Sequence, residues 1–331
     1  MSATELTVVS AFLLTLAILL DLVFGGKNLL GRVPDVSRLF AAPVHRFIPK
    51  LDRDTRSQEN RFFRGFAFTA LFLFLSFIAG TVINIGMAAL FTSNDILVYV
   101  GVITVLALLV RQRSVWDHAR EVIQSLGSLI ASGKPHDADT MHTNCRLLTQ
   151  TLIQTFTRTV TTGLLFILGG FALILPYLFL NEMMRFAAGG MVRPRSPFYS
   201  CAFWAHEILT LPATLMTLLV FAVALMVVPG GKPFTLFRTR LVLKNSMPSA
   251  VIPLGLYGFG RNLVFKYTDG SADTLAGNFK EIHTQWLGPK TGKARQGPRD
   301  LKSLLLVLWV SVSVYIAFIG LLVMLLVSQT Q

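Results

Sequence analysis

The chain has 331 residues, of which 53% are hydrophobic and only 14% are charged, whereas soluble domains average about 25% charged residues. This composition, together with 26 phenylalanines and two cysteines, excludes a soluble globular enzyme, a disordered chain and a disulfide scaffold. The class that remains is an all-α polytopic membrane protein. The net charge of +13 is expected to reflect membrane topology rather than nucleic-acid binding, because positive charge gathers on the cytoplasmic face.

Apolar segments of the right length are the first sign of organisation. A hydrocarbon core about 30 Å thick needs about 20 apolar helical residues. We expect one membrane domain over residues 1–331. Its six predicted spans are 6–24, 66–91, 96–110, 159–180, 209–228 and 304–327. The third span follows the second across the short polar loop 92–95, which predicts a helical hairpin.

The distribution of basic residues predicts the orientation. All but three of the 30 Lys and Arg residues lie in segments 25–65, 111–158 and 229–303, and the three exceptions lie between the fourth and fifth spans. The positive-inside rule makes these segments cytoplasmic and puts both termini outside. The expected location is the inner membrane of a bacterium.

The cytoplasmic segments differ in pattern. Apolar residues spaced by three and four within 111–158 predict two amphipathic helices, separated near Gly133 to Pro135, that pack together and lead into the fourth span. An amphipathic helix in the lipid interface is the alternative. The basic residues of 33–65 suggest contact with anionic headgroups. We expect loops at 266–302 and at the apolar stretch 250–260, which Pro253 and three glycines interrupt.

Few residues in the sequence suggest a catalytic or metal-binding site. The run from His136 to Cys145 holds metal-ligand residue types, but a polar turn whose Asp caps the following helix accounts for it, and no metal site is predicted. Asp21 is costly inside a span, so a functional and a structural role both stay open. His206 and Glu207 are ionisable, but an interfacial position accounts for them. Gly258 and Gly260 lack the residues that complete a phosphate loop.

Short motifs along the chain resemble the CobD/CbiB family of adenosylcobinamide-phosphate synthases. Asp21 and Gly25 match the family's motif at the end of its first span, where Gly26 replaces an acid. Asp139 and Thr140 resemble its Arg-Asp-Thr turn, and Asn181 matches its Asn-x-x-Asp motif. Elsewhere the residues that stand where the family has acids are Gln154, Arg158, Thr162, Met184 and Leu254.

This resemblance implies an inherited fold and a lost activity. The family joins cobyric acid to an aminopropanol group with ATP, and Mg²⁺ requires carboxylate oxygens that this chain has replaced. We therefore expect a pseudoenzyme without cofactors, comparable to the AmpE-like proteins. Its predicted role is that of a subunit or assembly factor that binds other integral membrane proteins.

Two other functions remain open at this stage. One is a divergent synthase that uses Mg²⁺ and ATP at Asp21, Asp139, Asn181 and Glu207. The other is a transporter or channel in which Asp21 lies on an ion pathway.

Overall fold

The computed structural model describes residues 3–25, 38–91, 96–110, 112–131, 138–188, 193–238, 246–269 and 283–328. Helices dominate this part of the chain, as expected for an all-α polytopic membrane protein. Their bounds are α1 Ala3–Phe24, α2 Ala41–Leu51, α3 Gln58–Phe91, α4 Ile96–Val110, α5 Gln112–Ala131, α6 Ala138–Gly169, α7 Phe171–Ala188, α8 Ser200–Val227, α9 Pro248–Arg261 and α10 Pro298–Ser328. Two short 3-10 helices, η3 Pro197–Tyr199 and η4 Pro233–Arg238, complete the helical set among these residues.

The long apolar helices agree in part with the six predicted spans. Within the described ranges, five helices are long and apolar enough to cross a membrane, and a sixth span is counted if α4 and α5 together form one. Helices α1 and α4 reproduce the predicted spans 6–24 and 96–110 closely. Helices α3, α8 and α10 begin before the predicted spans 66–91, 209–228 and 304–327.

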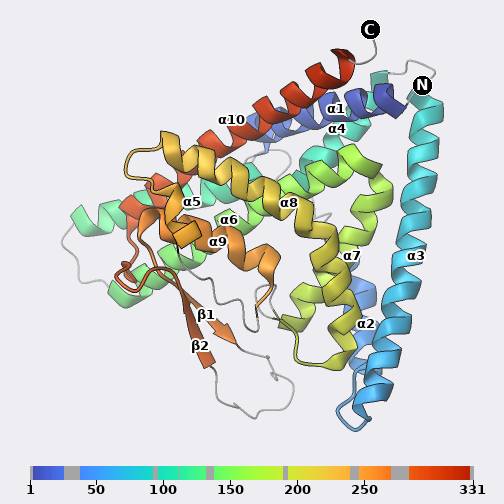
Figure 1. The fold of residues 1–331 in the computed structure, drawn as a ribbon, viewed down its shortest axis with the longest axis horizontal. Coiled ribbons are helices and arrows are strands. Elements are labelled where there is room, and N and C mark those ends of the chain that lie inside the picture. The colour runs from blue at the N-terminus through green and yellow to red at the C-terminus, as the bar shows by residue number, and fades with distance from the viewer. Residues whose placement is uncertain are drawn as a thin grey trace.

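The arrangement of the helices differs from the expected hairpin. Helix α4 packs mainly along α1, which also lies beside α10, whereas α3 forms one long edge of the molecule with α7 next to it (Figure 1). The start of α1, the end of α3 and the end of α10 lie toward the same end of the molecule (Figure 1). Residues 92–95 lie outside the described part of the chain.

The predicted fourth span, 159–180, is wrong because two helices replace it. Helix α6 runs without interruption from Ala138 to Gly169, and α7 begins at Phe171. Gly170 between them has a φ of 61°, a left-handed conformation that side chains with a Cβ rarely adopt. The chain therefore turns within the apolar segment, and α7 packs against α6 instead of extending it.

A side chain from α3 forms hydrogen bonds with the backbone at this turn. Asn84 donates a hydrogen bond from Nδ2 to the carbonyl oxygen of Gly169 at 2.8 Å, and its Oδ1 accepts one from the backbone N–H of Phe171 at 2.9 Å. Gly80, one turn earlier on α3, lies so near the carbonyl of Phe171 that a Cβ there would collide with it. Helix α3 thus fixes the start of α7 by close contact and by hydrogen bonds.

The predicted loop at 250–260 is wrong, and the predicted loop at 266–302 is wrong in part. Residues 250–260 lie in helix α9, whose side chains are almost all buried and which ends at Asn262, with a φ of 56°. Burial against α8 and α6 outweighs the poor helix propensity of Pro253 and the glycines. Segment 266–302 contains most of an antiparallel hairpin, β1 Phe265–Asp269 and β2 His283–Leu287, and the start of α10.

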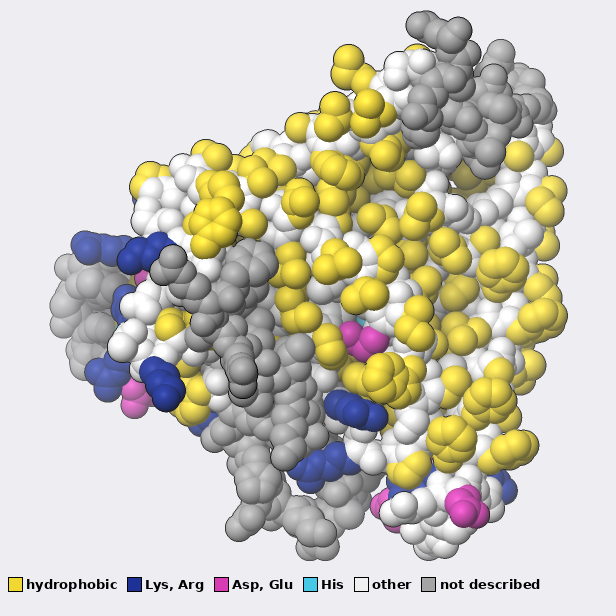
Figure 2. Space-filling view, viewed as in Figure 1, with side chains coloured by type: hydrophobic (Ala, Val, Ile, Leu, Met, Phe, Trp, Pro, Cys, Tyr) yellow, Lys and Arg dark blue, Asp and Glu magenta, His cyan; other side chains and the backbone are white. Residues whose placement is uncertain are grey.

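The predicted pair of packed amphipathic helices within 111–158 is present. Helices α5 and α6 pack on each other, and α6 continues directly into the apolar region. Figure 2 shows hydrophobic side chains over most of the visible face, whereas the described Lys and Arg residues lie in its left and lower parts and an acidic side chain is visible near its middle. A face that is mostly apolar is expected for a membrane-embedded protein.

The turn at Gly170 yields a stability prediction. We expect Gly170→Ala to lower the free energy of unfolding by about 1–2 kcal/mol, because an L-residue is disfavoured at a left-handed φ and a Cβ would displace Asn84. Thermal unfolding in detergent measures the effect. Gly86→Ala on α3 is the matched control, since nothing lies within 4 Å of its Cβ position, and equal losses for both variants would contradict the prediction.

Candidate functional site

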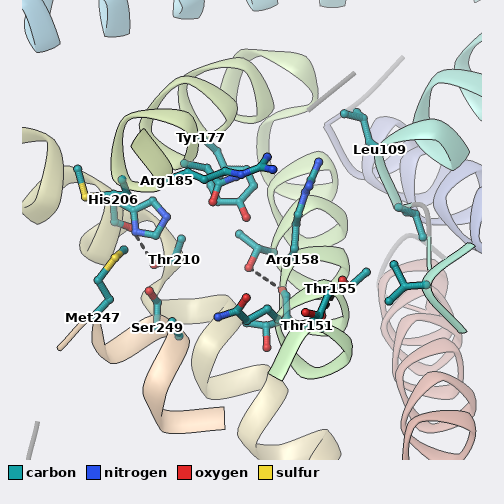
Figure 3. A pocket seen from close by; sticks show the side chains of 18 of the residues that line it. Leu109, Thr151, Thr155, Arg158, Tyr177, Arg185, His206, Thr210, Met247 and Ser249 are labelled. Atoms are coloured by element: carbon teal, nitrogen blue, oxygen red, sulfur yellow. Dashed lines mark hydrogen bonds between the residues drawn. The ribbon is translucent and has the colours of Figure 1, made fainter. Parts of the chain in front are cut away.

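A cavity of about 490 Å³ lies between the ends of α4 and α5 and the facing sides of α6, α7, α8 and α9. Its volume falls within the range of small-molecule sites. Figure 3 shows side chains from these helices pointing into one space. The lining is mostly polar along α6, where it includes Thr151, Gln154, Thr155, Thr157, Arg158 and Thr161.

The cavity brings together residues that the sequence singled out separately. Gln154 and Arg158 come from α6, and Asn181 and Met184 come from α7. The predicted topology separated these pairs by a membrane span. They meet because the chain turns at Gly170, so that α7 returns beside α6.

The ionisable side chains that line the cavity are basic or phenolic, and none of them is a carboxylate among the described residues. The guanidinium groups of Arg158 and Arg185 point toward one another beside Tyr177 (Figure 3). His206 lines another wall, and its ring stacks on Tyr177 with centroids 6.0 Å apart. Among the described lining residues there is no Asp or Glu.

Two carboxylates lie next to the cavity without lining it. Glu182 is buried, with its Oε2 3.7 Å from Arg185 and its Oε1 3.8 Å from the ring of His45. Glu207 accepts hydrogen bonds from the backbone N–H and the hydroxyl of Ser249, at 3.0 and 2.7 Å. Glu207 therefore holds the first turn of α9 in place.

The threonines of the cavity are bonded within their own helices. Thr155, Thr157 and Thr161 each donate to the carbonyl four residues earlier, at 2.8 to 2.9 Å. Thr210 on α8 donates to the carbonyl of His206 in the same way, at 2.8 Å. The strong donors that face the cavity are consequently the guanidinium and amide groups.

Asp21 does not line this cavity and has a structural role. It is fully buried, and its Oδ2 accepts hydrogen bonds from the backbone N–H groups of Gln112 and Arg113, at 2.8 and 3.1 Å. These are the first N–H groups of α5, so Asp21 caps that helix from α1. The negative charge also complements the positive end of the helix dipole.

The remaining residues that resemble the family's motifs do not reach the cavity. Asp139 and Thr140 lie in the first turn of α6, about 16–18 Å along the helix from Thr151. Thr162 and Leu254 are buried but are not part of the lining. Gly26 lies outside the described residues.

The metal-ligand residue types near the start of α6 do not gather into a site. His142 Nδ1 lies 2.6 Å from the carbonyl oxygen of Gln296, and Cys145 is buried. The described part of the chain holds no group of three or more His, Cys, Asp or Glu residues arranged to bind a metal. His136 and Asp137 fall outside that part.

Several cavity residues were missed from the sequence. Arg185 was assigned to an outer loop, Tyr177 gave no signal, and Ser249 was not proposed as a site residue. Tyr177 lies in an apolar run that reads as a span. Only the turn at Gly170 and the helical state of α9 bring these side chains to one place.

Comparisons with known proteins add no assignment. No protein-family model matches the chain, and neither a curated protein nor a solved structure matches it.

The capping role of Asp21 can be tested by substitution. We expect Asp21→Ala to lower the free energy of unfolding by about 1 kcal/mol or more, because two N–H groups of α5 lose their acceptor. Asp21→Asn should lose less, since it keeps an oxygen in that place. Chemical denaturation followed by circular dichroism measures both, and an Asn variant as unstable as the Ala variant would rule out capping as the dominant role.

Proposed function

We propose that this chain is a non-catalytic integral membrane protein on a CobD/CbiB-like scaffold, and that it serves as a subunit or assembly factor of a membrane complex. One observation carries the proposal. Three residues that stand where the family has acids, Gln154, Arg158 and Met184, line one cavity together with the matching Asn181. A cavity in which these positions meet is what a former active site would leave.

The chemistry of the cavity argues against a magnesium nucleotide. Mg²⁺ is bound through carboxylates and phosphate oxygens in near-octahedral geometry. The described lining offers the amides of Gln154 and Asn181, the thioether of Met184 and two guanidinium groups. A guanidinium at Arg158 repels a divalent cation at the position where the resemblance implies a ligand.

The alternative, an active synthase, finds less support. It requires Asp21, Asp139, Asn181 and Glu207 to act together. Asp21 caps α5, Glu207 holds α9, and Asp139 lies more than two turns from the lining residues of α6. Of the four, Asn181 alone lines the cavity.

We further propose a bacterial inner membrane with the charged end of the molecule in the cytoplasm and both termini outside. Because α7 turns back, Arg185 joins Arg158 on one side, which strengthens the asymmetry of charge. Arg61 at the start of α3 donates to Ser196 just before α8, at 3.0 Å. Arg261 bonds both Pro229 beyond the end of α8 and Ser303 at the start of α10. Since both ends of α8 lie beside the starts of α3 and α10, the proposed orientation requires α8 to enter and leave the membrane on the cytoplasmic side, although its length and composition alone would allow it to cross.

The proposed partner surface is the outer face of α3. The phenylalanines of this helix divide into two sets. Phe68 and Phe72 pack inward against Phe179. Phe63, Phe66, Phe74 and Phe77 repeat at helical spacing on the other side and are 70%, 48%, 63% and 48% exposed. Exposed aromatic residues are favoured at the centre of protein interfaces.

Loss of the synthase reaction is tested by complementation. We expect no growth when the chain is expressed in a strain that lacks the synthase and is supplied with cobyric acid, because the cavity lacks ligands for Mg²⁺. A functional synthase on the same vector is the positive control, and a tag verifies that the chain reaches the membrane. Growth would overturn the non-catalytic proposal.

The subunit role is tested by purification in mild detergent. We expect a stoichiometric partner that is lost from the double variant Phe74→Ala/Phe77→Ala, since truncation of central aromatic residues weakens interfaces by about tenfold or more. Phe12→Ala is the control, because Phe12 is 61% exposed on α1. A monodisperse chain without a partner, or a partner retained equally by all variants, would contradict the role of α3.

A further inference from the structure

We propose that the cavity binds the phosphate group of an anionic ligand between Arg158 and Arg185. This inference goes beyond the role in a complex and rests on that proposal only in assuming that no magnesium nucleotide fills the cavity. The ligand class is a phosphate ester, either a phospholipid headgroup or a small soluble phosphate compound.

The helix geometry brings the two guanidinium groups to one level. Arg158 lies about 18 Å before the turn at Gly170 along α6, and Arg185 lies about 22 Å after it along α7. Side chains tilt toward the N-terminus of their helix, so Arg158 reaches away from the turn and Arg185 reaches back toward it. The difference in level is thereby reduced, and Figure 3 shows the two groups converging.

The electrostatics favour an anion in this space. Two guanidinium groups that converge repel each other, and an anion between them replaces that repulsion by two attractions. Glu182 lies on α7, as Arg185 does, and its Oε2 is 3.7 Å from the guanidinium group of Arg185. This buried carboxylate compensates part of the positive charge of Arg185. His206 lines the same cavity, and its Nδ1 lies 3.4 Å from Oε1 of Glu207.

The shape of the donor set favours a phosphate over a carboxylate. A guanidinium group presents a planar fork of N–H donors that can bind two oxygens of one phosphate. The two forks come from different helices, and the amides of Gln154 and Asn181 add donors from α6 and α7. A tetrahedral phosphate offers oxygens in several directions at once, whereas a carboxylate offers two in one plane.

The cavity has room for more than the phosphate group. Its volume of about 490 Å³ extends to Leu109, Val110 and Val115 at the junction of α4 and α5. Met247 and Ala250 provide further apolar surface next to Ser249, at the start of α9. A phosphate ester with an apolar or mixed substituent therefore fits the composition of the lining.

The experiment uses the full-length chain, purified in neutral detergent without phosphate. Thermal unfolding is recorded against sodium phosphate and against sodium chloride at equal ionic strength. For a soluble phosphate ligand we expect a rise in melting temperature that is specific to phosphate, with an apparent Kd about tenfold or more weaker in Arg158→Gln and Arg185→Gln. Arg193→Gln is the control with the same change of charge, because Arg193 is exposed and lies outside the lining.

A second arm distinguishes the two sources of phosphate. The protein is reconstituted in phosphatidylcholine with or without phosphatidylglycerol, and native mass spectrometry detects retained lipid. A phospholipid ligand predicts retained phosphatidylglycerol that is lost in both cavity variants, with little response to inorganic phosphate. A soluble ligand predicts the reverse. Arg158→Lys keeps the charge and should keep part of the binding, which separates loss of the site from loss of the fold.

Two outcomes overturn the inference. If neither phosphate nor phosphatidylglycerol binds in a way that depends on Arg158 and Arg185, the cavity is not a phosphate site, and the role in a complex is unaffected. If ATP binds only when Mg²⁺ is present, both the phosphate site and the non-catalytic proposal fail.

Discussion

The architecture depends on the pairing of backbone groups where the chain turns between α6 and α7. An unpaired N–H or carbonyl group within a membrane costs several kcal/mol, so a broken helix persists there only where neighbours supply partners. Asn84 supplies both, as a donor to Gly169 and an acceptor from Phe171. This contact lets α7 return beside α6, and the returning helix provides the wall of the cavity that carries Asn181, Met184 and Arg185.

Much of the fold could be predicted from composition and periodicity. Long apolar runs identified α1 and α4 closely, and spacing by three and four identified α5 and the start of α6. The turn at Gly170 could not be predicted, because a pair of glycines within an apolar run does not by itself break a helix. Helix α9 was missed for the opposite reason, since burial stabilises a segment that its prolines and glycines disfavour.

The candidate site was only partly predictable. The motif resemblance pointed to Gln154, Arg158, Asn181 and Met184 one at a time, but their meeting depends on the turn of the chain. Asp21 and Asp139, which carried more weight in the sequence, lie elsewhere. An intramembrane acid was ambiguous from the sequence because a helix cap and an ion pathway require the same carboxylate.

The packing of α1 against α10 has a consequence for biosynthesis. Of the described helices α1 emerges from the ribosome first and α10 last, yet the two lie side by side. The face of α1 that α10 covers must therefore remain exposed to lipid, or to the insertion machinery, until all the other helices have been synthesised. Closure of the bundle is then a post-insertion event, and until it occurs the uncovered face of α1 is open to misassembly.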